Sequence, residues 1–182
     1  MPVSQYSNTD IHLVLGGARS GKSRYAETLA EQSALPVVYV ATAQALDQEM
    51  LSRIKQHQDQ RNKTWSTIEG QNDLAAVIRE LSSKRHCILV DCLTLWVAGF
   101  LCSDEVFQPY KKSLLAALRT TEHQIILVSN ETGMGIIPMG ELTRRFVDEI
   151  GFLHQEIASV ASKVTLMVAG IPMRVKGAHD HE

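Results

Sequence analysis

Short runs of β-branched and aliphatic residues alternate along this chain with longer segments in which apolar positions recur every three or four residues. The short runs show no alternation of apolar and polar positions, which is typical of strands buried on both faces of a sheet. The longer segments are typical of helices that cover such a sheet. Strands are predicted at residues 11–15, 37–41, 88–91, 124–129 and 164–169, and helices at residues 20–33, 46–61, 71–82, 93–101, 110–122 and 144–162.

Strands that alternate with helices predict βαβ units, and therefore a mostly parallel sheet with helices on both faces. With 182 residues and neither an internal repeat nor a linker, the chain is expected to form one α/β domain over residues 11–176. Residues 1–10 are interpreted as a polar leader and residues 177–182 as a flexible tail. Gly151 is a candidate break in the last helix.

Composition narrows the classes of function. A net charge of −2 provides no basic field for nucleic acid or an anionic membrane, so an anionic ligand must be bound by a local site. The most apolar stretch, residues 87–102, is too short to span a bilayer, and the N-terminal residues show no signal-peptide pattern, so a cytoplasmic protein is expected. The three cysteines fit no zinc spacing, and their odd number argues against a disulfide framework.

The strongest motif is the segment GGARSGKS at residues 16–23, which fits the phosphate-loop pattern G-x-x-x-x-G-K-[ST] between a predicted strand and a predicted helix. Its glycines let backbone N–H groups converge on phosphate oxygens, and the helix N-terminus adds a positive dipole end. Lys22 is predicted to reach the β and γ phosphates, and the Ser23 hydroxyl to bind Mg²⁺. The alternative is a chance match in a glycine-rich turn. The predicted phosphate-binding residues are Gly16, Gly17, Ala18, Arg19, Ser20, Gly21, Lys22 and Ser23.

Asp91 ends the hydrophobic strand at residues 88–91, which is the usual position of a Walker B carboxylate that holds Mg²⁺. An aspartate at a strand end is also a common helix N-cap, and Asp91 could cap the helix that begins near Leu93. Paired with the phosphate loop, the metal site is the favoured interpretation.

His57 is a second candidate. It shares a predicted helix face with Ile54, so it could be a histidine at the edge of the core. Arg53 and Arg61 lie four residues before and after it, where two cations would favour a neutral, nucleophilic imidazole and attract a triphosphate. A neutral imidazole can attack phosphorus and form a phosphoramidate, which splits one group transfer into two steps.

These motifs together resemble the bifunctional adenosylcobinamide kinase / adenosylcobinamide-phosphate guanylyltransferase family of cobalamin biosynthesis. The resemblance runs in order from about residue 11 to residue 176. The segment at 128–138 and the segment with His57 are much more specific than the phosphate loop. The resembling segments are residues 16–23, 39–43, 47–50, 53–57, 65–69, 90–96 and 128–138.

The resemblance implies a RecA-like P-loop fold, a homotrimer and two successive reactions. ATP or GTP phosphorylates adenosylcobinamide, and GMP is then transferred from GTP to that phosphate to give adenosyl-GDP-cobinamide. The second reaction passes through a guanylylated histidine, and His57 is the matching position. Mg²⁺ would lie on Ser23 and Asp91. The implied nucleotide-binding residues beyond the phosphate loop are Ala41, Thr42, Ala43, Gln58, Asp59, Gln60, Arg61, Glu69 and Asp91.

Some residues depart from the family's pattern or keep a plain alternative. Many relatives carry an arginine where Val147 stands and an asparagine where His154 stands. The resemblance therefore implies the nucleotide chemistry, but not the details of the corrinoid or subunit contacts. Glu69 could bind a ribose or guanine edge, or be a solvated acid at a strand end. Asn130 and Glu131 follow a strand, where they face the usual ligand edge of an α/β sheet or simply form a turn.

Two other functions fit the phosphate loop alone. One is a simpler small-molecule kinase in which His57 is structural. The other is a RecA-like ATPase module, against which the weak net charge and the lack of a basic stripe both speak.

Overall fold

The computed structural model of the protein describes residues 9–43, 62–70, 72–81, 84–103 and 105–177. The strands are β1 (Ile11–Gly16), β2 (Val37–Ala41), β3 (Ser66–Glu69), β4 (Cys87–Asp91), β5 (Gln124–Asn130), β6 (Lys163–Val168) and β7 (Ile171–Lys176). The helices are α1 (Lys22–Gln32), α3 (Leu74–Glu80), α4 (Leu93–Leu101), α5 (Phe107–Thr120) and α6 (Glu141–Val160).

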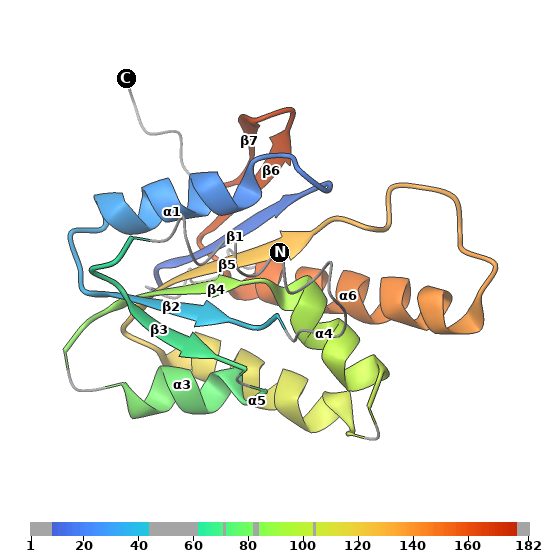
Figure 1. Cartoon of the computed structure of the whole chain (residues 1–182), viewed down its shortest axis with the longest axis horizontal. Helices are drawn as coiled ribbons and strands as arrows, with labels where there is room; N and C mark the ends of the chain where they lie inside the picture. The colour runs from blue at the N-terminus through green and yellow to red at the C-terminus, as the bar shows by residue number, and fades with distance from the viewer. Residues whose placement is uncertain (1–8, 44–61, 71, 82–83, 104, 178–182) are drawn as a thin grey trace, which may run out of the picture.

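The described strands form one sheet in the order β3-β2-β4-β5-β1-β6-β7. Every neighbouring pair is parallel except β6 and β7, which are antiparallel. Helix α1 covers one face of the sheet, and α3, α4, α5 and α6 cover the other (Figure 1). The predicted three-layer α/β architecture with a mostly parallel sheet is therefore confirmed.

Strand β1 shows how the sequence builds both layers of the core. Its side chains point alternately to the two faces, so Ile11 and Leu13 join the larger cluster under α3 to α6, while Val14 joins the smaller cluster under α1. All three are fully buried, which explains a continuous apolar run in place of an alternating one.

The structure differs from the prediction at both edges of the sheet. Strand β3 has only four residues, and they are mostly exposed, so its sequence carries little hydrophobic signal. Strand β7 follows β6 after a tight turn in which Ala169 and Gly170 have positive φ values of 51° and 83°. Its side chains are almost all exposed on the sheet edge. Its sequence therefore lacks the apolar run that is typical of a strand buried on both faces of a sheet.

Helix α6 runs unbroken from Glu141 to Val160, so the candidate break at Gly151 is wrong. The buried stripe of Ile150, Leu153 and Ile157 anchors the helix on both sides of the glycine. That packing outweighs the helix penalty of one glycine, which is about 1 kcal/mol. None of the helices that the structure describes is long and apolar enough to cross a lipid bilayer.

Candidate functional site

The predicted phosphate loop connects the carboxyl end of β1 to the start of α1 and is tightly coiled. Arg19 and Gly21 adopt left-handed conformations, with φ values of 56° and 90°. A Cβ atom on Gly16 would lie only 2.6 Å from Ser20 Oγ and 2.7 Å from the carbonyl oxygen of Met167. The loop therefore needs glycine at residue 16. Successive N–H groups of a loop coiled in this way can form a concave site for an anion such as phosphate.

Lys22 lies within this loop. Its ammonium group donates a hydrogen bond of 2.6 Å to the carbonyl oxygen of Gly17, and the residue is only 7% exposed. Burial lowers the pKa of Lys22, while the nearby Cys92 and Asp91 raise it. The ammonium group is thus held against the phosphate loop, and the Asp91 carboxylate at the end of β4 favours its charged form.

Several predicted site residues meet at the carboxyl edge of the sheet. Ala41 at the end of β2 pairs with Glu69 in β3 on one side and with Asp91 in β4 on the other. Gly16 at the end of β1 pairs with Asn130 at the end of β5, the strand between β1 and β4. Crevices at this edge of an open α/β sheet are the usual place for ligands.

Asp91 is oriented by Tyr39, a residue that the sequence did not single out. The Tyr39 hydroxyl donates a hydrogen bond of 3.1 Å to Asp91 Oδ2. Its ring stacks on Trp65 with 6.4 Å between the centroids. The N-cap of α4 is Cys92, so Asp91 lies one residue too early to cap the helix, and the helix-cap interpretation is wrong.

Thr42 joins the ends of β2 and β4. Its hydroxyl donates to the carbonyl oxygen of Cys92 at 2.6 Å and accepts from the Cys92 N–H at 2.9 Å. The side chain is buried. It therefore fixes the main chain beside Asp91, and Ala43, which is partly exposed, follows it at the same edge.

The predicted nucleophile and its neighbours lie outside the described residues. These are His57, Gln58, Asp59, Gln60 and Arg61, and Arg53 before them. The described chain stops at Ala43, two residues after the carboxyl end of β2, and continues at Asn62, before β3. Ala43, the last described residue before His57, thus lies at the edge that holds Asp91 and the phosphate loop.

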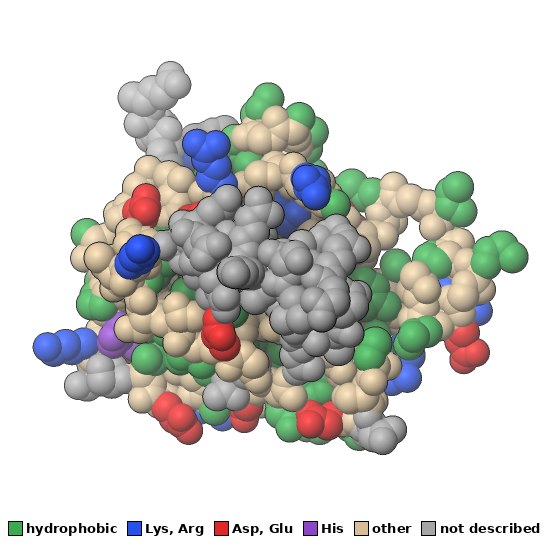
Figure 2. Space-filling view, viewed as in Figure 1, with side chains coloured by type: hydrophobic (Ala, Val, Ile, Leu, Met, Phe, Trp, Pro, Cys, Tyr) green, Lys and Arg blue, Asp and Glu red, His purple; other side chains and the backbone are tan. Residues whose placement is uncertain are grey.

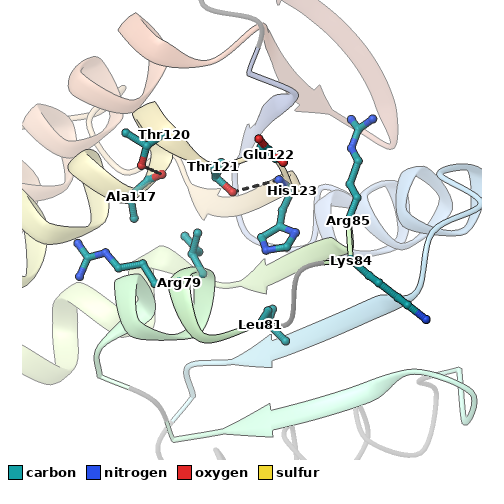
Figure 3. A pocket seen from close by; sticks show the side chains of 10 residues that line it. Arg79, Leu81, Lys84, Arg85, Ala117, Thr120, Thr121, Glu122 and His123 are labelled. Carbon is teal, nitrogen blue, oxygen red and sulfur yellow. Dashed lines mark hydrogen bonds between the residues drawn. The ribbon is translucent and has the colours of Figure 1, made fainter.

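A cavity of about 240 Å³ lies at the opposite edge of the sheet, near the amino ends of β4 and β5 (Figure 3). Its two arginines already have partners, because Arg79 donates to Ser113 and Arg85 pairs with Asp10 at 2.8 Å. The cavity is separate from the nucleotide edge. It is lined by Ile78, Arg79, Leu81, Lys84, Arg85, Ala117, Thr120, Thr121, Glu122 and His123.

A group of buried polar residues lies behind the nucleotide edge, and no pattern in the sequence connects its members. Thr94, Ser129 and His154 form a hydrogen-bonded chain that ends at the Asn130 N–H. His154, a departure from the family's pattern, is buried inside the domain, so its side chain is not placed for a surface contact. The available signal was a pair of polar residues, Ser129 and Asn130, directly after the aliphatic run at residues 125–128 of the strand.

The parallel sheet, the coiled loop after β1 and the carboxylate at the end of β4 define a P-loop nucleotide-binding α/β protein. The chain belongs to the cobinamide kinase / cobinamide phosphate guanyltransferase family, whose model matches residues 12–175. It is thus a bifunctional cobinamide kinase and guanylyltransferase of adenosylcobalamin biosynthesis.

Relatives cover nearly the whole chain. A bifunctional adenosylcobalamin biosynthesis protein of Pseudomonas aeruginosa is 52% identical over 167 residues, which is 91% of this chain and 96% of the relative. One from Escherichia coli is 36% identical over 179 residues, which is 90% of this chain and 98% of the relative.

Solved structures share the fold at low identity. A protein of Pyrococcus horikoshii has a TM-score of 0.56 at 11% identity and covers 94% of this chain and 88% of its own. An ATPase from a bacterial type III secretion system has a TM-score of 0.51 at 11% identity and covers 87% of this chain and 51% of its own. These likenesses concern the fold alone.

Proposed function

We propose that the chain phosphorylates adenosylcobinamide with ATP or GTP, and that it then transfers GMP from GTP through His57 to give adenosyl-GDP-cobinamide. The observation that carries the proposal is the arrangement of the carboxyl edge, where Lys22 is held against the phosphate loop near Asp91. One triphosphate site there can serve both reactions in turn, because the two nucleophiles attack different phosphorus atoms of the triphosphate that is bound in each.

In the first reaction, the cobinamide hydroxyl oxygen attacks the γ phosphorus, and the bond from that phosphorus to the bridging oxygen breaks. The backbone N–H groups of the loop and the Lys22 ammonium bind the phosphate oxygens, so they stabilise the charge that develops on the leaving diphosphate. The hydroxyl proton leaves as the new phosphate ester forms.

In the second reaction, a nitrogen of neutral His57 attacks the α phosphorus of GTP, and pyrophosphate leaves. The product is a phosphoramidate, which the phosphate oxygen of cobinamide phosphate then attacks, so that the imidazole is released and GMP is transferred. The position of Ala43 at the nucleotide edge supports this role, because Ala43 is the last described residue before His57 in the chain.

We propose Mg²⁺ as the metal, with the Ser23 hydroxyl and the Asp91 carboxylate as its protein ligands. In the part of the chain that the structure describes, no group of three or more His, Cys, Asp or Glu side chains could hold a metal ion. The two proposed ligands suit Mg²⁺, which commonly binds through one or two side chains together with substrate phosphates. When bound, it would neutralise charge on the reacting phosphates.

The remaining nucleotide contacts are proposed at the same edge. Glu69 lies in register with Ala41, where its carboxylate could accept hydrogen bonds from a ribose or a guanine. The family resemblance adds Ala41, Thr42 and Ala43. It also adds Gln58, Asp59, Gln60 and Arg61 beyond the histidine.

We propose a homotrimer, and an apolar surface supports an association between copies. The connection from β5 to α6 projects from the body of the domain, with hydrophobic side chains along it (Figure 2). Ile136 is 97% exposed and Met139 is 95% exposed, with Met134, Ile137 and Leu142 also exposed. Large exposed apolar groups of this kind usually mark an interface. Light scattering should give the trimer mass, and a monomer mass over a wide concentration range would exclude it.

The guanylyl intermediate is tested by incubation of the enzyme with GTP labelled on the α phosphate. We expect covalent label that acid releases and alkali does not, as for a phosphoramidate, and peptide mapping that places GMP on His57. GTP labelled on the γ phosphate is the control and should leave no label. Label that survives acid, or that maps to another residue, would exclude the histidine mechanism, and the absence of label would indicate a simple kinase.

A further inference from the structure

A chain of buried hydrogen bonds runs from α6 to the end of β5. His154 Nε2 lies 2.8 Å from Ser129 Oγ, and Ser129 Oγ lies 3.2 Å from Thr94 Oγ1. Thr94 Oγ1 accepts a hydrogen bond of 2.7 Å from the Asn130 N–H. The three side chains are 7%, 0% and 8% exposed, so these bonds replace hydrogen bonds to water.

The distances allow all three hydrogen bonds to run in one direction. The Asn130 N–H donates to Thr94, the Thr94 hydroxyl donates to Ser129, and the Ser129 hydroxyl donates to His154 Nε2. Burial lowers the pKa of the His154 imidazole, although the Glu131 carboxylate opposes this, and burial thereby favours the neutral ring, in which Nε2 can accept a hydrogen bond. Each hydroxyl then donates once and accepts once, and His154 terminates the chain.

The end of this chain lies at the centre of the nucleotide edge. Asn130 pairs with Gly16 of the phosphate loop, and the Glu131 N–H donates to the Gly16 carbonyl oxygen at 3.0 Å. Thr94 is the third residue after Asp91 and stands in the first turn of α4. Strand β5 lies between β1 and β4. The hydrogen-bonded side chains therefore connect three parts of the fold at one point: the strand before the phosphate loop, the segment after Asp91, and α6.

We propose that His154 is a positioning residue for phosphoryl transfer, which acts through Ser129 and Thr94 to fix the main chain of Asn130 between the phosphate loop and Asp91. This role rests on the proposed kinase reaction. The loop glycine and the carboxylate must keep one separation for the triphosphate to lie in line with the acceptor hydroxyl, and displacements of about 1 Å cost on the order of 100-fold in rate. Loss of the His154 imidazole, which is the last acceptor of these hydrogen bonds, loosens the end of β5, and β5 sets this separation.

His12 provides a matched control, because it makes the same kind of bond elsewhere. Its Nε2 lies 2.8 Å from Thr165 Oγ1, and the residue is 8% exposed. That bond joins β1 to β6 near the amino half of β1, away from the end of β5. Loss of the His12 imidazole should therefore affect stability without moving the nucleotide edge.

The test compares His154→Ala, His154→Asn and His12→Ala in the full chain, with cobinamide phosphorylation measured well below each variant's melting temperature. We expect His154→Ala to lower kcat by about tenfold or more with little change in the nucleotide KM. His154→Asn should restore most of the loss, because its amide can accept from Ser129. His12→Ala should lower the melting temperature and leave kcat unchanged.

Hydrogen exchange at Asn130 gives a readout that does not depend on activity. The Asn130 amide should exchange faster in His154→Ala, and also in Thr94→Val, which removes its acceptor and serves if His154→Ala fails to fold. A native chain that phosphorylates no cobinamide would refute the assigned kinase activity. An active native enzyme with unchanged kcat and Asn130 exchange in His154→Ala, or with equal kcat losses in the His154→Ala and His12→Ala variants, would refute the positioning role alone.

Discussion

Replacement of Gly16 by alanine should both destabilise the domain and distort the phosphate loop. The new Cβ would lie 2.6 Å from Ser20 Oγ and 2.7 Å from the Met167 carbonyl oxygen. Ser20 can rotate, but the carbonyl belongs to β6, which is paired with β1, so the strands or the loop must move.

The magnitude follows from three contributions. Forced overpacking costs about 1–3 kcal/mol. The backbone at Gly16 has φ of 155°, a conformation that side chains rarely adopt and that adds about 1–2 kcal/mol. Alanine also lowers the conformational entropy of the unfolded chain, which stabilises the folded state by about 0.4–1 kcal/mol. The net loss should be about 1–5 kcal/mol, which for a domain of this size lowers the melting temperature by on the order of 10 °C.

Gly17 is the matched control, since it belongs to the same loop. A Cβ on Gly17 would meet no described atom within 4 Å, so Gly17→Ala should change stability by less than about 1 kcal/mol. Thermal unfolding of both variants and titration with a nucleoside triphosphate provide the comparison. Equal melting temperatures for Gly16→Ala and the native chain, together with unchanged nucleotide affinity, would refute the close packing that we describe for the loop.

Three further predictions concern charged and titratable groups. Lys22→Ala should abolish both activities, because one phosphate loop serves both reactions; full guanylylation of this variant would indicate a second nucleotide site. Asp91→Asn should lower both rates by on the order of 100-fold and raise the Mg²⁺ concentration that is needed, whereas unchanged Mg²⁺ titration curves would exclude a metal role. Burial, with Lys163 and Arg174, lowers the pKa of His12 to about 4 from an ordinary value of 6.5. The unfolded chain therefore binds a proton at His12 more readily than the folded chain does. The part of the free energy of unfolding that depends on a neutral His12 is present above pH 6.5 and is lost as the pH falls to about 4. Urea unfolding should show a loss of about 3 kcal/mol over that window that His12→Asn lacks, and parallel curves for the two proteins would contradict it.

The amino-acid sequence alone was sufficient for those features that depend on local pattern. The phosphate loop needs a fixed order of residues between a strand and a helix, so the roles of Gly16 and Lys22 could be predicted from that order. The buried strands could also be predicted from local pattern, because a short aliphatic run such as the one in β4 is typical of a strand that is buried on both faces of a sheet. Strands β3 and β7 were missed because edge strands bury few side chains.

Features that depend on register could not be predicted from local pattern. The row of Glu69, Ala41 and Asp91 exists only because β2 lies between β3 and β4 with their carboxyl ends aligned. Tyr39 looked like one more apolar residue of a strand, and its contact with Asp91 spans 52 positions of sequence. His57 was assigned through family resemblance and its flanking arginines, and its role stays a prediction.

The most direct test of the two-reaction account is to measure both activities of His57→Ala with the same adenosylcobinamide. Phosphorylation needs only the loop, the metal and the acceptor hydroxyl, whereas guanylyl transfer also needs the imidazole as nucleophile. We predict that His57→Ala still forms cobinamide phosphate, while it loses both the covalent GMP and the GDP-cobinamide product. A variant that still makes GDP-cobinamide, or one that loses both activities while it remains folded and binds nucleotide, would contradict the account.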